Sequence, residues 1–176
     1  MPTTFSRFPS PLGELILTAS DTAITGIYFP TLDHIPQDRA GWLEDDGSGH
    51  GHTGALLARA RQQLTEYFGG SRTGFDLPLD PIGTPFQRRV WQALRTIPYG
   101  TTTSYGELAR RLGDVRATRA VGAANGKNPI PIIVPCHRVV GAKGELTGFG
   151  GGLDRKRWLL EHEGALMRLG GGSPRV

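Results

Sequence analysis

The spacing of apolar residues changes along this chain of 176 residues, and the change restricts the folds open to it. Thr4–Phe8, Leu12–Ala19 and Ile24–Phe29 alternate apolar and polar residues, with proline, glycine or polar turn residues between them. Alternation with a period of two predicts half-buried antiparallel strands. From residue 55 onward the apolar residues recur mainly at helical spacing. Strands followed by helices predict a mixed protein of the α/β (α+β) class.

Helix boundaries are marked by capping residues. Ala55–Phe68 carries a broad apolar face, and a Gly-Gly pair follows it. Thr84 and Pro85 give the next helix an N-cap and a proline at its first position. Ser104 and Glu107 have the spacing of a capping box. We therefore expect three helices to begin at these places.

A further helix is expected over Ala117–Asn125, and small residues dominate it. With the helix that precedes it across a short turn, it fits a helix-turn-helix arrangement. Tight packing inside the domain is the commoner explanation of such small residues. The alternative is a helix that approaches another surface closely.

Other segments carry weaker patterns. Thr31–Thr53 is acidic and rich in glycine, which predicts a loop, and Phe75–Leu79 predicts another strand. Pro129–Pro135 predicts a buried extended segment, because proline restricts both itself and the residue before it. Gly141–Gly152 predicts a flexible hairpin or wing. Asp154 is expected to cap a last helix that ends at His162.

Charge is distributed unevenly. Residues 1–80 hold five basic and ten acidic residues, a net charge of −5, and residues 81–176 hold fifteen and six, a net charge of +9. A basic half suggests a polyanionic partner, although solvated surface charge would give the same arithmetic. No segment has the apolar length of a membrane span, and the N-terminus lacks a signal-peptide core. We therefore expect a cytoplasmic protein without membrane contact.

Cys136 is the only cysteine, which excludes an intrachain disulfide and a multi-thiolate zinc site. A lone cysteine is more often a small buried hydrophobe than a nucleophile. Here His137 and Arg138 follow it, and a nearby imidazole or positive charge favours the reactive thiolate. Adjacent side chains on an extended chain diverge, so contact needs a bend or a bridging water. Spacing leaves four candidates for the carboxylate that would orient the imidazole: Glu145, Asp154, Glu161 and Glu163.

The segment Pro135-Cys136-His137-Arg138-Val139 resembles the active-site signature of the O6-alkylguanine-DNA alkyltransferases. The similarity runs without a visible gap from Thr84 to Gly164, and its further landmarks are Ser104-Tyr105, Arg119-Ala120-Val121-Gly122 and Asn128-Pro129-Ile130-Pro131. It implies an N-terminal RNase H-like domain of sheet and helix over 1–80. It also implies a C-terminal helical, winged helix-turn-helix domain over 84–166, followed by a tail over 167–176.

The resemblance implies an activity and assigns roles. Cys136 would take an alkyl group from guanine O6, and less readily from thymine O4, in a single irreversible event. His137 would draw the thiol proton through a water, and Glu163 would hold the imidazole. Tyr105 would donate a hydrogen bond or proton near the base, and Asn128 would act as a hinge behind the cysteine.

DNA contacts follow from the same resemblance. Arg119 would fill the gap left by a flipped nucleotide, because a base inside a duplex must be extruded before its substituent can be reached. The small-residue helix would enter the minor groove. The implied partner is double-stranded DNA containing O6-alkylguanine, and the protein would be a monomer, with clustering on DNA left open. The DNA-binding candidates are Arg119, Ser104, Tyr105, Ala120, Ala123, Asn125 and Lys127, and the pocket candidates are Val139, Phe149 and Gly150.

Two departures from the family concern metal and substrate range. The zinc site that some relatives form with N-terminal cysteines and histidines cannot exist here, because no cysteine precedes Cys136. His34, His50 and His52 lie in the expected loop, where solvated side chains are a commoner explanation than a metal site, so no cofactor is expected. Phe149 stands where many relatives have tyrosine, which leaves tolerance of large alkyl groups open.

Three rival functions remain. An alkyltransferase-like protein that binds alkylated DNA typically has tryptophan at the cysteine position. A transcription factor would leave the Cys-His pair unexplained. A cysteine hydrolase would need oxyanion-hole and partner residues that the sequence does not reveal.

Overall fold

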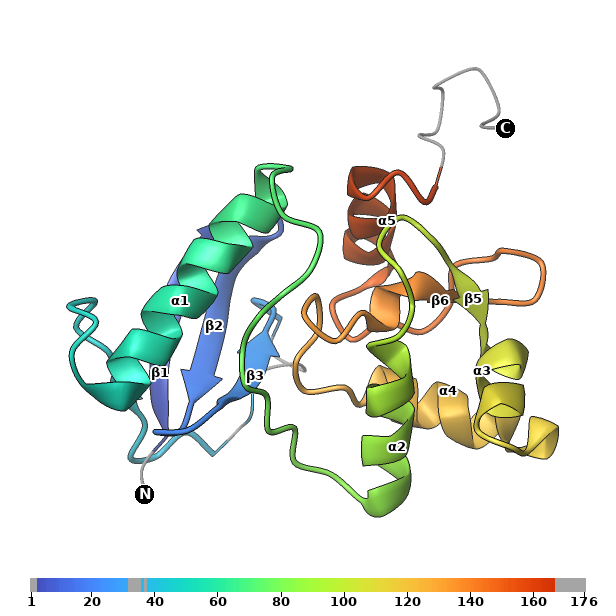
Figure 1. The fold of residues 1–176 in the computed structure, drawn as a ribbon, viewed down its shortest axis with the longest axis horizontal. Coiled ribbons are helices and arrows are strands. Elements are labelled where there is room, and N and C mark those ends of the chain that lie inside the picture. Colours follow the sequence, from blue (N-terminus) through green and yellow to red (C-terminus); the bar gives the residue numbers. More distant parts are fainter. Residues whose placement is uncertain (1–2, 32–35, 37, 167–176) are drawn as a thin grey trace. The chain divides into compact units, whose positions relative to one another are not determined.

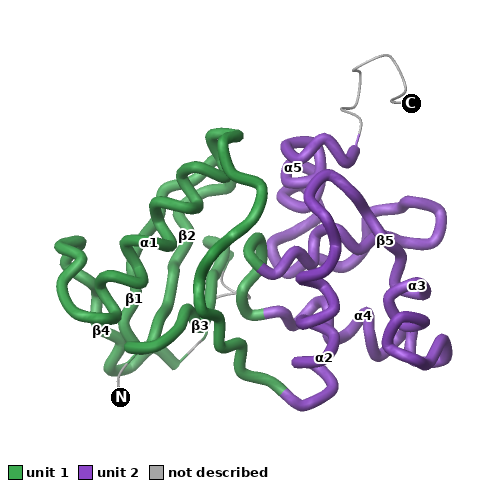
Figure 2. The backbone as a smooth tube through the Cα atoms, in the orientation of Figure 1, with its two compact units in different colours: residues 1–83, 129–133 green, residues 84–128, 134–176 purple. Residues whose placement is uncertain are grey.

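The computed structural model describes residues 3–31, 36 and 38–166, and the chain divides into two compact units. The first unit contains residues 1–83 and the short segment 129–133 (Figure 2). The second contains residues 84–128 and 134–176. The segment 129–133 thus falls inside the range expected for the C-terminal domain but groups with the N-terminal unit. Of the expected tail, residues 167–176 lie outside the described part.

The first unit is built on a four-stranded sheet (Figure 1). Its strands lie in the order β3-β2-β1-β4, with β1, β2 and β3 antiparallel and β4 parallel to β1. The first three confirm the strands expected from alternation, whereas the two-residue β4 lies in the segment expected to be a loop. The bounds are β1 Thr4–Ser10, β2 Gly13–Ala19, β3 Ile24–Tyr28 and β4 Leu43–Glu44.

Helix α1, Gly51–Phe68, packs on this sheet (Figure 1). Leu57, Leu64 and Tyr67 are fully buried, so the apolar face recognised in the sequence is the packing face. The helix starts four residues earlier than expected, inside the expected loop. It ends at the predicted Gly-Gly pair, where Gly70 has a φ of +85°.

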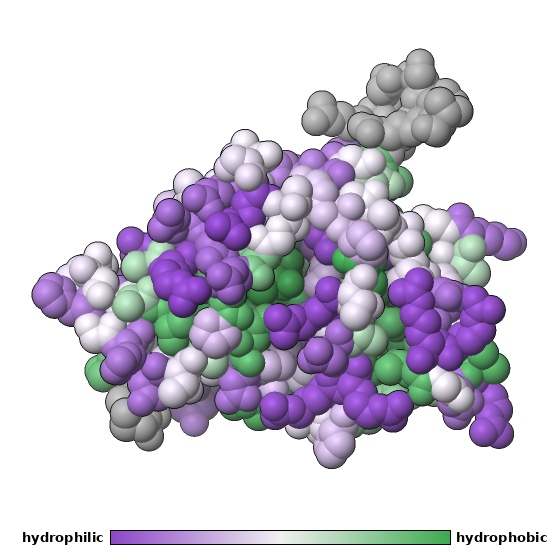
Figure 3. Space-filling model, viewed as in Figure 1, coloured by the Kyte–Doolittle hydropathy of each residue, from purple (hydrophilic) through white to green (hydrophobic). Residues whose placement is uncertain are grey.

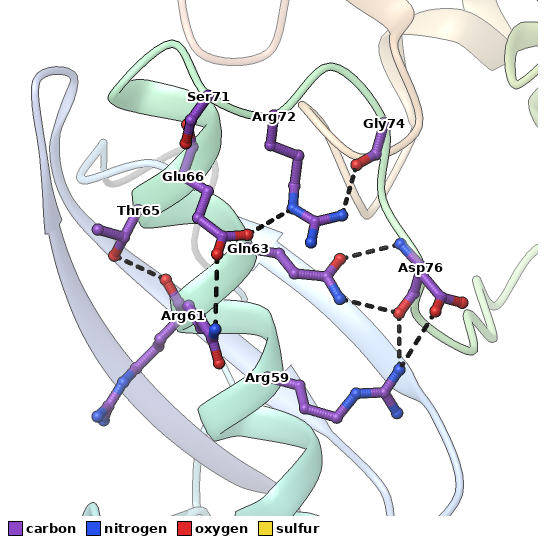
Figure 4. Close-up of polar contacts among 10 residues, drawn as sticks. Arg59, Arg61, Gln63, Thr65, Glu66, Ser71, Arg72, Gly74 and Asp76 are labelled. Carbon is purple, nitrogen blue, oxygen red and sulfur yellow. Dashed lines mark hydrogen bonds and ion pairs between the residues drawn. The ribbon is translucent and has the colours of Figure 1, made fainter.

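The strand expected over Phe75–Leu79 does not form. Only Leu79 makes a bridge, parallel to Ile24 of β3. At Asp76 the side chain of Gln63 takes the place of a neighbouring strand: its Oε1 accepts from the backbone N–H at 2.9 Å, and its Nε2 donates to the C=O at 3.0 Å (Figure 4). The backbone groups of Asp76 are satisfied without a ladder.

The second unit is helical. Thr84 caps α2 with both halves of a capping box, because its hydroxyl accepts from the Gln87 N–H and the Gln87 side chain accepts from the Thr84 N–H. Ser104 caps α3 by accepting from the Glu107 N–H at 3.1 Å. The bounds are α2 Pro85–Leu94, β5 Thr103–Ser104, α3 Tyr105–Arg111, α4 Thr118–Gly126, β6 Val139–Val140 and α5 Leu153–His162.

Helices α3 and α4 form the expected helix-turn-helix, joined through a 3-10 turn over Val115–Ala117. Helix α4 packs on both α2 and α3. The Trp91 indole of α2 donates to the Ala124 carbonyl of α4 at 2.8 Å. Hydrophilic side chains gather at the surface over α3 (Figure 3), where Arg110 and Arg111 are exposed. The mixed fold class expected from the sequence is confirmed.

Two expectations near the C-terminus need correction. Residues 141–152 contain turns but no strand, so of the two expected alternatives, hairpin or wing, the hairpin does not form; the strand before them, β6, pairs in parallel with β5 instead. Asp154 does not cap α5: Gly152, with a φ of +92°, is the N-cap, and Asp154 lies in the first turn. A carboxylate there still faces the free N–H groups of the helix start. Within the described ranges, no helix combines the length and apolar character needed to cross a membrane.

Candidate active site

The chain reaches Cys136 through a turn rather than through the expected extended segment. Residues 131–133 form a turn, and Ile132 has a φ of +75°. The restriction imposed by a following proline acts on Ile130 and Val134 but leaves Ile132 free to adopt another conformation. The expectation of a fully extended 129–135 was therefore wrong. Cys136 opens a 3-10 turn, Cys136–Arg138, and is 4% exposed.

Two asparagines hold the backbone around the cysteine. The Asn128 Nδ2 donates to the Val134 carbonyl at 2.8 Å, and the same carbonyl accepts from the Cys136 N–H at 2.8 Å. The Asn125 Nδ2 donates to the Cys136 carbonyl at 3.4 Å. Both asparagines are buried. Cys136 is therefore tied to the loop before it and to the end of α4.

The Cys136 thiol is neutral before substrate arrives. Burial raises the pKa of the thiol to about 11, because it disfavours the thiolate. A hydrogen bond with Asn128 and the positive charge of Lys156 both act in the opposite direction without outweighing burial. A base is therefore required to remove the proton at neutral pH.

The His137 imidazole is placed to be that base. Its Nε2 lies 2.8 Å from Glu163 Oε2, and both side chains are completely buried. Burial lowers the pKa of His137, although the Glu163 carboxylate partly opposes this. The neutral ring donates its Nε2 proton to the carboxylate, which leaves a lone pair on Nδ1. This Nδ1 has no protein partner within the described part of the chain.

Arg138 holds the Glu163 carboxylate in place, and that carboxylate in turn orients His137. Its Nε donates to Glu163 Oε1 at 2.8 Å, a second guanidinium nitrogen donates to Oε2 at 3.0 Å, and the third donates to the Ile97 carbonyl at 2.7 Å. Burial would raise the pKa of Glu163, but hydrogen bonds and charges from His137 and Arg138 outweigh it and hold that pKa well below its usual range. The carboxylate is therefore ionised.

The structure selects Glu163 from the four carboxylates that spacing left open. Glu145 accepts instead from the Lys143 N–H at 2.9 Å on the surface, and Asp154 lies at the start of α5. Glu161 is half-buried beside Glu163 in sequence, but the helix turns it to another face.

Lys156 is part of the site, although sequence reasoning missed it. The side chain is fully buried on α5, and its Nζ donates to the carbonyls of Val139 and Thr147, both at 2.6 Å. Burial lowers the pKa of this ammonium to about 8. Helical spacing could have found it, since Lys156 shares a face with Leu159, Leu160 and Glu163.

Tyr105 meets the same loop. Its hydroxyl donates to the Thr147 carbonyl at 2.9 Å and accepts from the Thr147 hydroxyl at 3.3 Å. The ring lies beside Gly122, where an added Cβ would sit 3.7 Å from it. The Lys156 ammonium lies 5.8 Å from the ring centroid. Burial raises the pKa of Tyr105, so the phenol keeps its proton and remains a donor.

The remaining candidates separate into surface and interior positions. Arg119, Ala120, Ala123 and Lys127 are exposed on or just after α4, and their helical spacing places them toward one side of it. Asn125 does not belong with them, because it is 1% exposed behind Cys136. Ser104 serves as the N-cap of α3. Of the pocket candidates, Val139 is buried, Phe149 is half-buried and Gly150 is exposed.

The described residues contain no group of three or more histidine, cysteine, aspartate or glutamate side chains that could hold an ion. His50 and His52 lie at the start of α1. His34 lies outside the described residues.

Comparison with known proteins gives a consistent result over both units. Residues 4–81 match the ribonuclease-like domain of 6-O-methylguanine DNA methyltransferase, and residues 85–165 match its DNA binding domain. A methylated-DNA--protein-cysteine methyltransferase of Mycobacterium tuberculosis is 51% identical over 90% of this chain and 91% of its own length. A constitutive relative in Bacillus subtilis is 44% identical over 90% and 94%.

Solved structures agree. The O6-methylguanine methyltransferase of M. tuberculosis superposes with a TM-score of 0.82 at 47% identity, covering 93% of each chain. A structure of the M. tuberculosis protein in complex with DNA gives 0.81 at 48% identity, covering 92% and 93%. With both domain models matched in order and these relatives aligned almost end to end, the chain belongs to the 6-O-methylguanine DNA methyltransferase family.

Proposed function

We propose that this protein repairs alkylated double-stranded DNA by moving the alkyl group from guanine O6, and less readily from thymine O4, onto Cys136. The observation that carries the proposal is the buried thiol of Cys136 next to a neutral histidine, His137. The Nε2 of this histidine is hydrogen-bonded to the ionised carboxylate of Glu163. The names of the relatives, which describe transfer from methylated DNA to a protein cysteine, support the same chemistry.

Proton removal starts the reaction. His137 Nδ1 accepts the Cys136 proton through a bridging water. The resulting imidazolium is stabilised by Glu163, and Arg138 keeps that carboxylate in place. The sulfur then attacks the alkyl carbon as the carbon–oxygen bond breaks. The electron pair stays with the guanine, which leaves as a neutral base after taking a proton from the Tyr105 hydroxyl. The proton held by His137 then returns through water to Tyr105, so that one proton in total moves from the thiol to the base.

The base must leave the duplex to reach Cys136. Extruding it costs a few kcal/mol. Arg119, exposed on α4, offsets part of this by entering the stack in its place. Ala120 and Ala123 on the same helix bring the backbone close to the minor groove, and Lys127 contacts phosphate. The exposure of all four side chains supports this arrangement.

The reaction occurs once per molecule. A thioether is a very poor leaving group, and no second cysteine exists to receive the alkyl group. The protein is consumed as a monomer in proportion to the damage that it repairs. No cofactor is needed, because the acceptor, base and donor are all side chains of this chain.

Intact-protein and peptide mass spectrometry tests the proposal. After incubation with duplex DNA containing O6-methylguanine, the peptide that carries Cys136 should gain one methyl mass, with one methyl per protein molecule. Cys136→Ala should abolish transfer and keep duplex binding, which separates the enzyme from a binding protein of the alkyltransferase-like kind. Methylation elsewhere, or several turnovers per molecule, would contradict the mechanism.

A further inference from the structure

We propose that Ile132 is a positioning residue for Cys136: its buried side chain holds the backbone in a left-handed conformation that sets the path of the chain into the nucleophile. The proposal rests on the role of Cys136 as the alkyl acceptor. It assigns a task to a residue that neither touches the reacting atoms nor belongs to the proton relay.

The backbone of Ile132 is strained. Its φ of +75° is the only positive φ at a residue other than glycine in residues 3–31, 36 and 38–166. In this region the Cβ of an L residue crowds the neighbouring carbonyl, and a branched Cβ makes the crowding worse. A proline followed by a residue of positive φ has the pattern of a type II turn, which normally places glycine or asparagine there. Local preference therefore opposes the observed conformation.

The offsetting interaction is burial of the side chain. Ile132 is 1% exposed, and Ile130, two residues before it, is 0% exposed. Both belong to segment 129–133, which groups with the sheet-bearing first unit, whereas Asn128 and Val134 on either side belong to the second (Figure 2). The Pro129 carbonyl also accepts from the Ile27 N–H of β3 at 2.9 Å. The segment is thus anchored in the first unit through its backbone, and the side chains of Ile130 and Ile132 are buried.

The anchored turn leads directly to the nucleophile. Val134, two residues after Ile132, offers the carbonyl that accepts both the Asn128 side chain and the Cys136 N–H. If Ile132 returned to a negative φ, the chain would leave the turn in another direction, and the Val134 carbonyl would lose the Asn128 side chain as a donor. An error of about 1 Å in the position of a reacting group can slow a reaction about a hundredfold.

Glycine and alanine at this position distinguish positioning from packing. Ile132→Ala removes the anchoring side chain but keeps the Cβ that makes φ +75° unfavourable, whereas Ile132→Gly removes both. We expect the single-turnover rate of methyl transfer to Cys136, at saturating duplex, to be about tenfold lower in Ile132→Ala than in Ile132→Gly. Wild type should be the fastest. A role in packing alone gives the opposite order, because glycine deletes more volume and loosens the chain.

Ile133 supplies the matched control. It is the next residue, is 8% exposed and has no positive φ. There the alanine variant should be as fast as the glycine variant or faster. Affinity for unalkylated duplex should stay within twofold in all four variants, since none of the changes touches the exposed face of α4. If a variant is too unstable for the rate assay, the urea midpoints decide the matter, with glycine expected to exceed alanine at position 132 only.

Each result has a distinct meaning. An alanine variant as fast and as stable as the glycine variant at position 132 would overturn the positioning role, and so would a glycine advantage at both positions. Wild-type protein that gains no methyl on Cys136 would instead refute the proposed function, and with it this inference. One methyl per molecule in every active variant, with only the rate changed, separates the two ideas.

Discussion

At the scale of single residues, the site depends on which protons are held before substrate binds. The Cys136 thiol keeps its proton, His137 is neutral, and Glu163 is ionised. Each state follows from burial set against specific partners. The proton relay of Cys136, His137 and Glu163 is therefore ready to pass one proton from the thiol to the imidazole. Its one full negative charge, on Glu163, is paired with the Arg138 guanidinium.

Removing that negative charge should affect both stability and rate. Glu163→Gln keeps the size of the side chain but leaves the buried Arg138 without an anion, a loss of about 3–5 kcal/mol in the free energy of unfolding. The methyl transfer rate should fall at least about a hundredfold, because the imidazolium of His137 loses its counter-ion. Urea unfolding and single-turnover mass spectrometry measure the two effects.

The control for this variant is Glu161→Gln on the same helix. Glu161 is half-buried and takes no part in the relay, so its unfolding free energy should change by no more than about 0.5 kcal/mol. Equal effects of the two substitutions would contradict the role assigned to Glu163.

Stability should depend on pH through His137. Its pKa in the folded protein lies below the ordinary 6.5, so near that pH the unfolded chain binds the extra proton. The contribution of neutral His137 to the free energy of unfolding is therefore fully present above pH 6.5. It is lost as the pH falls from there through the pKa that His137 has in the folded protein. Urea unfolding from pH 7.5 down to 5 should show this decline, and His137→Gln should lack that part of it. His52→Gln, at the exposed start of α1, should retain it.

At the scale of elements, the sequence predicted those strands and helix starts that depend on residues close to one another in the chain. Alternation predicted β1 to β3, and Thr84 and Ser104 began the helices expected of them, because strand patterns and caps act within a few residues. The missed elements depend on distant partners. The two residues of β4 exist by pairing with β1, and the Gln63 side chain replaced the expected strand at Asp76.

The site divides in the same way. Cys136 and His137 are adjacent, so sequence alone could propose them, whereas spacing left Glu163 among four carboxylates until the resemblance selected it. Arg138 and Lys156 act through contacts with residues up to 41 positions away. Helical spacing could have placed Lys156 on the face of α5 that carries Glu163, but no local pattern reveals the carbonyls to which these two side chains donate. The turn at Ile132 was missed because the burial that offsets its strain comes from tertiary structure.

The surface of α4 offers a test at this scale. Ala123 is exposed among the proposed minor-groove residues, and Ala123→Glu places a long carboxylate against the phosphates. Affinity for duplex DNA, measured by fluorescence anisotropy, should fall at least tenfold, while the free energy of unfolding changes by no more than about 0.5 kcal/mol. Ala55→Glu makes the same exchange on the exposed side of α1 and should leave affinity within twofold. Equal losses would mean that α4 is not the contact helix.

At the scale of the whole molecule, the uneven charge gains a physical meaning. The net +9 of residues 81–176 coincides with the unit that carries the helix-turn-helix and Cys136, and the net −5 of residues 1–80 coincides with the sheet unit. Binding to DNA releases counter-ions in proportion to the phosphates neutralised, so affinity should fall linearly on a logarithmic scale of salt concentration. The second unit, which carries the net positive charge, should account for this salt dependence of the affinity for DNA.

The phosphate contact made by a single basic residue can therefore be detected as a change in the salt dependence of binding. Lys127→Ala should make the slope of log affinity against log salt shallower by about 0.9, the value for one phosphate contact. Arg59→Ala, which removes one positive charge from the exposed face of α1, changes the net charge equally and should leave the slope unchanged. If net charge alone governed binding, the two variants would lose affinity together and their slopes would coincide. Different slopes at equal net charge would show that position, rather than the total of +4, determines how this protein meets DNA.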